Sequence, residues 1–237
     1  MKHIPNLFTL ANATCGVIAI YFITSHSLTG VAICLIAAAL FDLLDGFLAR
    51  KLGVQGPLGK ELDSLADAIS FGAAPAFLWA SILGDYGQIP QPFAIILGAF
   101  IAASSVYRLA KFNLDTTQNT DFIGMPTPAN ALFALGLWSW LGNWEQWEVL
   151  IHYNEDQQLV FTLVMLALWS INVYWLNAGF KVISFKQGEG VYRKYTQWSV
   201  IVLFPVLAYF FRSLSLSIIV LLMPIISYIT IRLEAKS

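Results

Sequence analysis

The sequence predicts an all-α integral membrane protein. Of its 237 residues, 58% are hydrophobic and only 11% are charged, and the mean hydropathy is +0.69. A soluble domain carries about 25% charged residues, so this chain has too few polar side chains to cover a globule in water. Its apolar residues gather into eight segments, most of them near the length of about 20 residues that crosses a bilayer. We therefore expect one membrane domain, residues 1–237, built as a bundle of about eight transmembrane helices.

Among the first four segments, the second and the third each contain two aspartates that interrupt the apolar pattern. Asp42 and Asp45 lie near the end of the second segment, and Asp63 and Asp67 lie near the start of the third. The segments are expected at about 6–25, 28–50, 62–83 and 91–111.

The last four segments are recognised mainly by their hydrophobicity. The fifth begins beside prolines, which suit the first turn of a helix, and the fifth and seventh are short. No connection is long enough to separate two domains. These segments are expected at about 127–143, 159–179, 197–211 and 214–232.

The basic residues are distributed very unevenly over the predicted loops. With a cytoplasmic N-terminus, 12 of the 13 lysines and arginines fall on one side and only Arg212 on the other. Such a bias sets the orientation of membrane proteins, so both termini are predicted to be cytoplasmic. The loop 142–158 on the far side is acidic, and Trp138, Trp140, Trp144 and Trp147 at its entry are typical of an interfacial aromatic belt. The twelve residues are Lys2, Arg50, Lys51, Lys60, Arg108, Lys111, Lys181, Lys186, Arg193, Lys194, Arg232 and Lys236.

The four aspartates of residues 41–67 form two pairs. Spacings of three residues (Asp42, Asp45) and four residues (Asp63, Asp67) place each pair on one face of a helix. The glycine-rich residues 51–60 predict a tight turn between the helices, so we expect antiparallel neighbours whose carboxylates face each other. Four carboxylates in an apolar setting repel one another unless cations lie among them. Oxygen ligands favour Mg²⁺ or Mn²⁺, so the pattern predicts a divalent metal site.

Two other interpretations of the aspartates remain open at this point. Ion pairs with Arg50, Lys51 or Lys60 account for one or two aspartates but not for four. Ion or proton transporters also use membrane carboxylates, usually near the midplane. Here the carboxylates cluster at one interface beside a basic turn, and the later segments hold no acidic residue well inside them. This placement favours an anionic ligand that carries phosphate.

The spacing around the aspartates resembles a known family signature. Asp42-x-x-Asp45-Gly46-x-x-Ala49-Arg50, followed after eight residues by Gly59 and then by Asp63 and Asp67 at intervals of three residues, is similar to the motif of the CDP-alcohol phosphatidyltransferase family. Residues 4–9 resemble the start of the family's first helix, and residues 70–76, 108–113 and 124–129 look like the branch of that family that uses serine. The resemblance covers roughly the first 130 residues.

The resemblance implies a reaction and a site. CDP-diacylglycerol would donate its phosphatidyl group to L-serine, with release of CMP. Asp42, Asp45 and Asp63 would hold two Mg²⁺ or Mn²⁺ ions, and Asp67 would contribute to one ion and act as general base. A homodimer is also expected from the family. The bias of the basic residues, independently, puts the turn 51–60 on the cytoplasmic side and the active site near that face. The residues expected to bind the CDP-lipid are Asn6, Thr9, Gly46, Arg50 and Gly59.

Several of these assignments have alternatives. Asn6 and Thr9 could equally belong to an ordinary helix start. Arg108, Lys111 and Asn113, at the end of the fourth segment, are expected to bind the acceptor, although positive-inside anchoring also explains Lys111. A sister enzyme with glycerol 3-phosphate or an inositol phosphate as acceptor would need further basic residues near the site.

Overall fold

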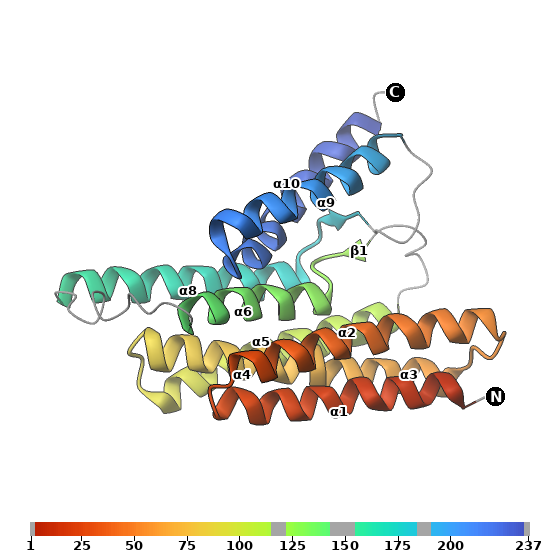
Figure 1. Cartoon of the computed structure of the whole chain (residues 1–237), viewed down its shortest axis with the longest axis horizontal. Coiled ribbons are helices and arrows are strands. Elements are labelled where there is room, and N and C mark those ends of the chain that lie inside the picture. Colours follow the sequence, from red (N-terminus) through yellow and green to blue (C-terminus); the bar gives the residue numbers. More distant parts are fainter. Residues whose placement is uncertain (1–2, 115–121, 143–154, 184–190, 235–237) are drawn as a thin grey trace.

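The computed structural model describes residues 3–114, 122–142, 155–183 and 191–234, and all eight predicted segments are helical (Figure 1). The third is compound: α3 (Pro57–Asp67) continues through a π-helical turn, η1 (Ala68–Ala73), into α4 (Ala74–Ser81) and a second π-helical turn, η2 (Ile82–Tyr86). The other helices are α1 (Ile4–Thr24), α2 (Leu28–Lys51), α5 (Gln91–Leu114), α6 (Thr127–Gly142), α8 (Glu155–Asn177), α9 (Val191–Phe211) and α10 (Leu214–Glu234).

Six of the helical segments in the described part of the chain are long and apolar enough to cross a membrane. They are α1, α2, the run Pro57–Tyr86, α5, most of α8, and α10. The two exceptions are the segments that the sequence shows to be short. At about 1.5 Å per residue, the 16 residues of α6 reach less far than the hydrocarbon core of about 30 Å, and α9 begins with a polar turn. The protein is an all-α integral membrane protein, as predicted, and the count of eight spans is approximate.

Local signals explain where the helices of the predicted metal site begin and end. After α2, Gly53 has φ +62°, and the N–H groups of Gly53 and Val54 bond back to the carbonyls of Arg50 and Ala49. Glycine adopts this left-handed conformation at little cost. Pro57 then occupies the first turn of α3, where its missing N–H costs nothing. The two aspartate-bearing helices are thus joined by a short turn, as the sequence predicts.

Helix α1 packs against α2, α3 and η1. Gly16 of α1 permits the contact with η1, because a Cβ atom at this position would lie 2.6 Å from the Cα of Ser70. In Figure 1, α1, α2 and α3 run alongside one another, with the N-terminus and the α2–α3 turn at the same end. This arrangement brings the first turns of α1 next to the aspartates.

A small antiparallel ladder that the sequence did not predict joins two connections. Strand β1 (Phe122–Ile123) pairs with β2 (Lys181–Val182). Gly124 follows with φ +74°, and its N–H bonds to the carbonyl of Phe180 at 2.9 Å. The ladder ties the segment before α6 to the segment after α8.

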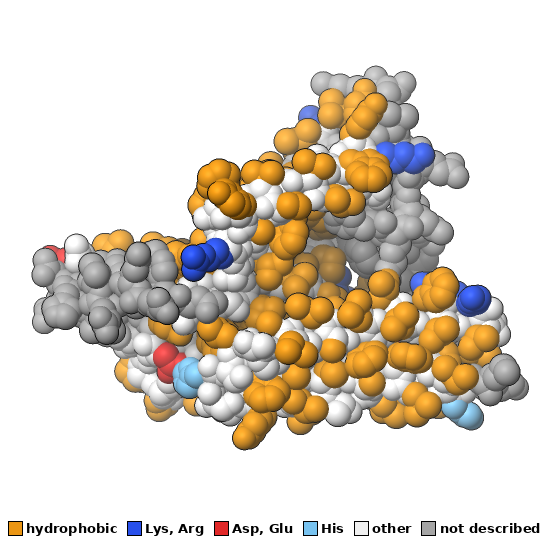
Figure 2. Space-filling view, viewed as in Figure 1, with side chains coloured by type: hydrophobic (Ala, Val, Ile, Leu, Met, Phe, Trp, Pro, Cys, Tyr) orange, Lys and Arg blue, Asp and Glu red, His pale blue; other side chains and the backbone are white. Residues whose placement is uncertain are grey.

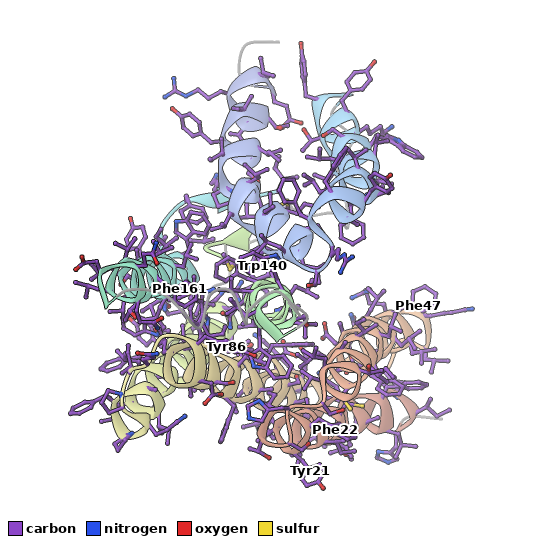
Figure 3. All side chains as sticks on the ribbon, turned by 60° about the vertical axis from the view of Figure 1, so that its left-hand side comes forward. Tyr21, Phe22, Phe47, Tyr86, Trp140 and Phe161 are labelled. Carbon is purple, nitrogen blue, oxygen red and sulfur yellow. The ribbon has the colours of Figure 1, made fainter. Side chains whose placement is uncertain are left out.

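The far end of the bundle is closed by aromatic residues. Figure 3 shows Tyr86, Trp140 and Phe161 gathered where η2, α6 and α8 meet. Thr162 of α8 donates a hydrogen bond to the carbonyl of Gly87 at 2.7 Å. Trp138 is only 1% exposed and donates to the Ser81 hydroxyl at 2.9 Å, so its prediction as an interfacial anchor was wrong. It packs in the core because α6 is enclosed by other helices.

The outer faces suit lipid. Figure 2 shows hydrophobic side chains along the outer faces of the helices. The exposed hydrophobic residues of α2 include Ile33, Leu40 and Phe47, each at least half exposed. Of the residues used to predict the orientation, Lys2, Trp144, Trp147, Lys186 and Lys236 lie outside the described residues, as does the side chain of Arg193.

Candidate active site

Three of the four predicted metal ligands converge. One carboxylate oxygen each from Asp42, Asp63 and Asp67 lies within 4.8 Å of the others. Asp42 and Asp63 are half-buried and Asp67 is 9% exposed. Three carboxylates held this close in a membrane helix bundle form a strongly negative centre. The predicted meeting of the two aspartate-bearing helices is thus present at Asp42, Asp63 and Asp67.

The fourth aspartate is engaged by α1. The Thr9 hydroxyl lies 2.5 Å from Asp45 Oδ2 and 3.2 Å from the carbonyl of Pro5, and it carries one proton to donate. The shorter contact to a carboxylate is the stronger bond. Both side chains are buried. Thr9 therefore fixes the direction in which Asp45 points, one helical turn from Asp42 on the same helix.

A cavity of about 370 Å³ lies beside the three carboxylates, between the start of α1, the end of α2 and the start of α3. Its lining includes Asp45 and Asp63, so it reaches the acidic centre. Lys60, Gln55 and the backbone of the α2–α3 turn complete its mouth. All five residues predicted to bind the CDP-lipid line this cavity: Asn6, Thr9, Gly46, Arg50 and Gly59.

The two glycines of the motif keep this cavity open in different ways. A Cβ atom on Gly46 would lie 3.3 Å from Nη1 of Arg50, so the guanidinium rests over the glycine. At Gly59 the nearest atom to such a Cβ would be Oδ1 of Asn6, at 3.8 Å. Gly46 thus lets Arg50 lie along its own helix and face the cavity. Gly59 leaves room beside Asn6.

The predicted acceptor residues separate into two groups. Arg108 is 7% exposed and interacts electrostatically with Asp67. Arg108 and Lys111 line a small cavity of about 60 Å³, with Asn177 of α8. Asn113 instead donates to the Ser64 hydroxyl at 2.8 Å. Arg108 and Lys111 thus share a recess beside α8, and Asn113 lies at the contact between α5 and α3.

Lys60 strengthens the contact between α3 and α5. Its ammonium donates to the backbone carbonyl of Asn113 at 2.6 Å. The Lys111 ammonium lies 5.6 Å from the centre of the Tyr107 ring, within reach of a cation–π interaction. The Lys111 contact lies within α5, so the two hydrogen bonds of Asn113, with Lys60 and with Ser64, join α3 to the end of α5.

Sequence reasoning did not predict which residues hold Asp67. Asn12, which is fully buried, donates to Asp67 Oδ1 at 3.2 Å, and Thr127 lies 3.5 Å from Oδ2. Asn130, also fully buried, donates to the carbonyl of Phe71 at 3.1 Å. Asn12 follows Thr9 by three residues, and this spacing is the one signal in the sequence that could have indicated it.

The acidic centre has the chemistry of a divalent metal site. Its donors are all carboxylate oxygens, which suit hard cations, and three of them lie within 4.8 Å of one another. The adjoining cavity presents Arg50, a side chain able to bind phosphate at two points. The residues fit divalent cations next to a phosphate-bearing ligand.

Comparison with known protein families shows to which family this chain belongs. The family model described as CDP-alcohol phosphatidyltransferase matches residues 2–182. The chain belongs to the CDP-alcohol phosphatidyltransferase family. The resemblance seen in the aspartate motif is thereby confirmed, and the match extends well beyond the motif into α8 and β2.

Relatives with curated names are similar over a little more than half of the chain. A Bacillus subtilis protein named CDP-diacylglycerol–serine O-phosphatidyltransferase is 36% identical over 129 residues, covering 54% of this chain and 71% of the relative. A Methanothermobacter thermautotrophicus protein named archaetidylserine synthase is 39% identical over 132 residues, 54% of each chain. A Mycobacterium tuberculosis protein with the same name as the first is 37% identical over 145 residues, 58% of this chain and 49% of the relative. The match thus spans about half the length of the second and third relatives.

Proposed function

We propose that this protein transfers the phosphatidyl group of CDP-diacylglycerol to the hydroxyl of L-serine, giving phosphatidylserine and CMP. The observation that carries the proposal is the convergence of Asp42, Asp63 and Asp67 beside a cavity lined by Arg50. Family membership supports the CDP-linked donor. The serine acceptor is supported by the names of the Bacillus and Mycobacterium relatives.

In this proposal the cavity at the start of α1 and α3 receives the CDP end of the lipid. Arg50 pairs with a phosphate, and Gly46, which has no side chain, leaves room for the guanidinium beside it. Asn6 and Thr9 present polar groups from α1 to the nucleotide or its phosphates, and Gly59 gives the ligand access to Asn6. The acyl chains extend into the bilayer along the exposed apolar faces of the neighbouring helices.

We assign the divalent ions to the aspartates. Asp42, Asp63 and Asp67 would hold Mg²⁺ or Mn²⁺ directly, and Asp45, oriented by Thr9, would complete the ligand set for a second ion. Such ions, when bound, stabilise the negative charge of a pyrophosphate and of the departing phosphate oxygen.

The remaining chemistry falls to the chain's own residues. The serine hydroxyl oxygen forms a bond to the phosphorus that carries the diacylglycerol, and the bond from that phosphorus to the oxygen of CMP breaks. Asp67 accepts the proton of the attacking hydroxyl. Asn12 and Thr127 hold the two oxygens of Asp67 in a fixed direction, and positioning of this kind contributes strongly to proton transfer.

Arg108 is the residue to which we assign the serine carboxylate. It is buried, it interacts electrostatically with Asp67, and its guanidinium can bind a carboxylate at two points. Lys111, at the adjoining recess, would attract the anionic end of the acceptor. Asn113 would contribute indirectly, by joining α5 to α3.

We further propose that the site faces the cytoplasm and that the protein works as a homodimer. The first part is supported by the charge bias of the sequence, since the site lies at the end of the bundle that holds Arg50, Lys51 and Lys60. The second part follows from the resemblance to the family alone.

The test is release of CMP from CDP-diacylglycerol by the detergent-purified protein, with Mg²⁺ or Mn²⁺ and a panel of acceptor alcohols. We expect release that depends on L-serine and is lost when the divalent ions are chelated. Release only with glycerol 3-phosphate or an inositol phosphate would replace serine by a sister acceptor. No release with any acceptor from a correctly folded protein would contradict the proposed enzymatic function and favour ion transport.

A further inference from the structure

Three helices direct buried polar residues at the segment Asp67–Gly72. On α1, Asn12 bonds to Asp67. On α5, Arg108 interacts with Asp67, and Ser105, one turn earlier, packs against Gly72. On α6, Thr127 reaches Asp67, and Asn130, one turn later, bonds to the carbonyl of Phe71. All five of these side chains are less than 8% exposed: Asn12, Ser105, Arg108, Thr127 and Asn130.

Four polar atoms of this group have no hydrogen-bond partner among the described residues: Oδ1 of Asn12, Oδ1 of Asn130, Oγ of Ser105 and Nε of Arg108. A buried polar group without a partner is costly, and more so inside a membrane protein. Each such group in a native structure therefore calls for an explanation, and a bound ligand is one.

The unpartnered oxygen of Asn12 lies close to the reacting centre. Nδ2 of Asn12 is 3.2 Å from Asp67, and Oδ1 shares a carbon with it, so that oxygen also lies beside the carboxylate. Asn130 is one helical turn from Thr127, whose hydroxyl approaches the other oxygen of Asp67. The two acceptors, on α1 and α6, and the Arg108 donor, on α5, therefore belong to three helices that pack around the segment Asp67–Gly72.

This set of atoms is the complement of a zwitterion. An α-ammonium group needs oxygen acceptors, and a carboxylate needs a cation with hydrogen-bond donors. We propose that the side-chain oxygens of Asn12 and Asn130 bind the α-ammonium group of the acceptor, opposite the carboxylate on Arg108, and thereby select an amino acid alcohol. This inference rests on the proposed function, and it names the residues that choose the acceptor.

The same atoms disfavour phosphorylated acceptors. A phosphate group offers oxygen acceptors only, and the amide oxygens of Asn12 and Asn130 have no proton to donate to it. Their amide nitrogens are already used, by Asp67 and by the carbonyl of Phe71. Discrimination against glycerol 3-phosphate then follows from unfavourable pairing in a buried site.

The test compares L-serine with two molecules that each lack one of its charged groups. Ethanolamine lacks the carboxylate, and 3-hydroxypropanoate lacks the ammonium. In Asn130→Leu, the serine KM and the inhibition constant of ethanolamine should each rise at least about tenfold, as expected for the loss of a hydrogen bond to a charged group. The inhibition constant of 3-hydroxypropanoate and the KM for CDP-diacylglycerol should stay within about twofold of their values in the wild type.

Asn172→Leu is the matched control. Asn172 of α8 is 1% exposed, and both polar atoms of its amide lack a partner among the described residues, but no hydrogen bond links it to the segment Asp67–Gly72. The variant Asn172→Leu should leave the two KM values and the two inhibition constants unchanged. Asn12→Leu tests the other oxygen if Asn130→Leu does not fold. It should show the same selectivity together with a lower kcat, because the bond to Asp67 is lost as well.

Two results would overturn the inference while leaving the proposed function intact. In the first, the serine KM and the inhibition constants of both analogues rise equally in the asparagine variants, which would mean a general loss of the acceptor pocket. In the second, none of these constants changes. A wild-type enzyme that releases CMP with another alcohol but not with serine would overturn the proposed function, and the inference with it.

Discussion

Replacing Asp67 by asparagine removes one negative charge and the proposed proton acceptor while keeping the size of the side chain. Asp67 supplies one of the three carboxylate oxygens that lie within 4.8 Å of one another. General-base catalysis contributes about 10²–10⁴ in rate, or roughly 3–5 kcal/mol at 1.36 kcal/mol for each factor of ten. The loss of a metal ligand adds to this, so we expect turnover to fall by at least about a thousandfold.

Binding of the lipid should survive this change. Asp67 does not line the cavity of about 370 Å³ that is assigned to the CDP group, whereas Asp45 and Asp63 do. The KM for CDP-diacylglycerol, or its dissociation constant measured directly, should therefore change by less than about threefold. CMP release at saturating serine and lipid, with divalent ion in excess, measures the turnover.

Asp85→Asn is the matched control for Asp67→Asn. Asp85 lies at the other end of the same membrane-spanning run, Pro57–Tyr86, and is exposed. It accepts hydrogen bonds from Ser81 and Gln91, which an asparagine oxygen could also accept. Normal activity is expected. Turnover of Asp67→Asn within tenfold of the wild type would show that another group accepts the proton.

Three further substitutions test the donor cavity, the acceptor site and the helix packing. Gly46→Ala places a Cβ atom 3.3 Å from the Arg50 guanidinium, and displacement of that group should raise the KM for CDP-diacylglycerol about tenfold without changing the serine KM. Arg108→Ala should raise the serine KM far more than the lipid KM, and an equal effect on both would move the acceptor site elsewhere. Gly16→Ala forces a Cβ atom to within 2.6 Å of the η1 backbone and should cost about 1–3 kcal/mol of stability. Gly179→Ala, which meets no atom within 4 Å, should leave thermal stability in detergent unchanged.

The helices could be predicted from the sequence because lipid imposes a strong and simple requirement. Each apolar run had to satisfy its backbone hydrogen bonds internally, and all eight proved helical. The π-helical turns η1 and η2 could not be predicted, since a change from i−4 to i−5 bonding leaves no mark in hydrophobic periodicity. The β1–β2 ladder is two residues long, too short for a strand pattern to be recognised.

The aspartates and the cavity residues could be located because charge and glycine stand out in an apolar sequence. Asn12, Ser105 and Asn130 could not be located in this way. Each is an uncharged polar residue within an apolar helix, where such side chains are common. Their importance arises only from partners on other helices, such as Asp67, which is 55 positions away from Asn12 along the chain. Pairings of that kind depend on how the helices pack, which one sequence does not specify locally.

Helix α1 shows why the motif alone does not make the site. Its residues Asn6, Thr9 and Asn12 are spaced by three, and at about 100° per residue three such positions spread over roughly 120° of the helix surface. One helix can therefore reach three places: Asn6 lines the cavity, Thr9 bonds to Asp45 on α2, and Asn12 bonds to Asp67 on α3. The direction of both aspartates depends on a helix that contributes no carboxylate. Substitutions along this stripe should accordingly impair catalysis even where all four aspartates are intact.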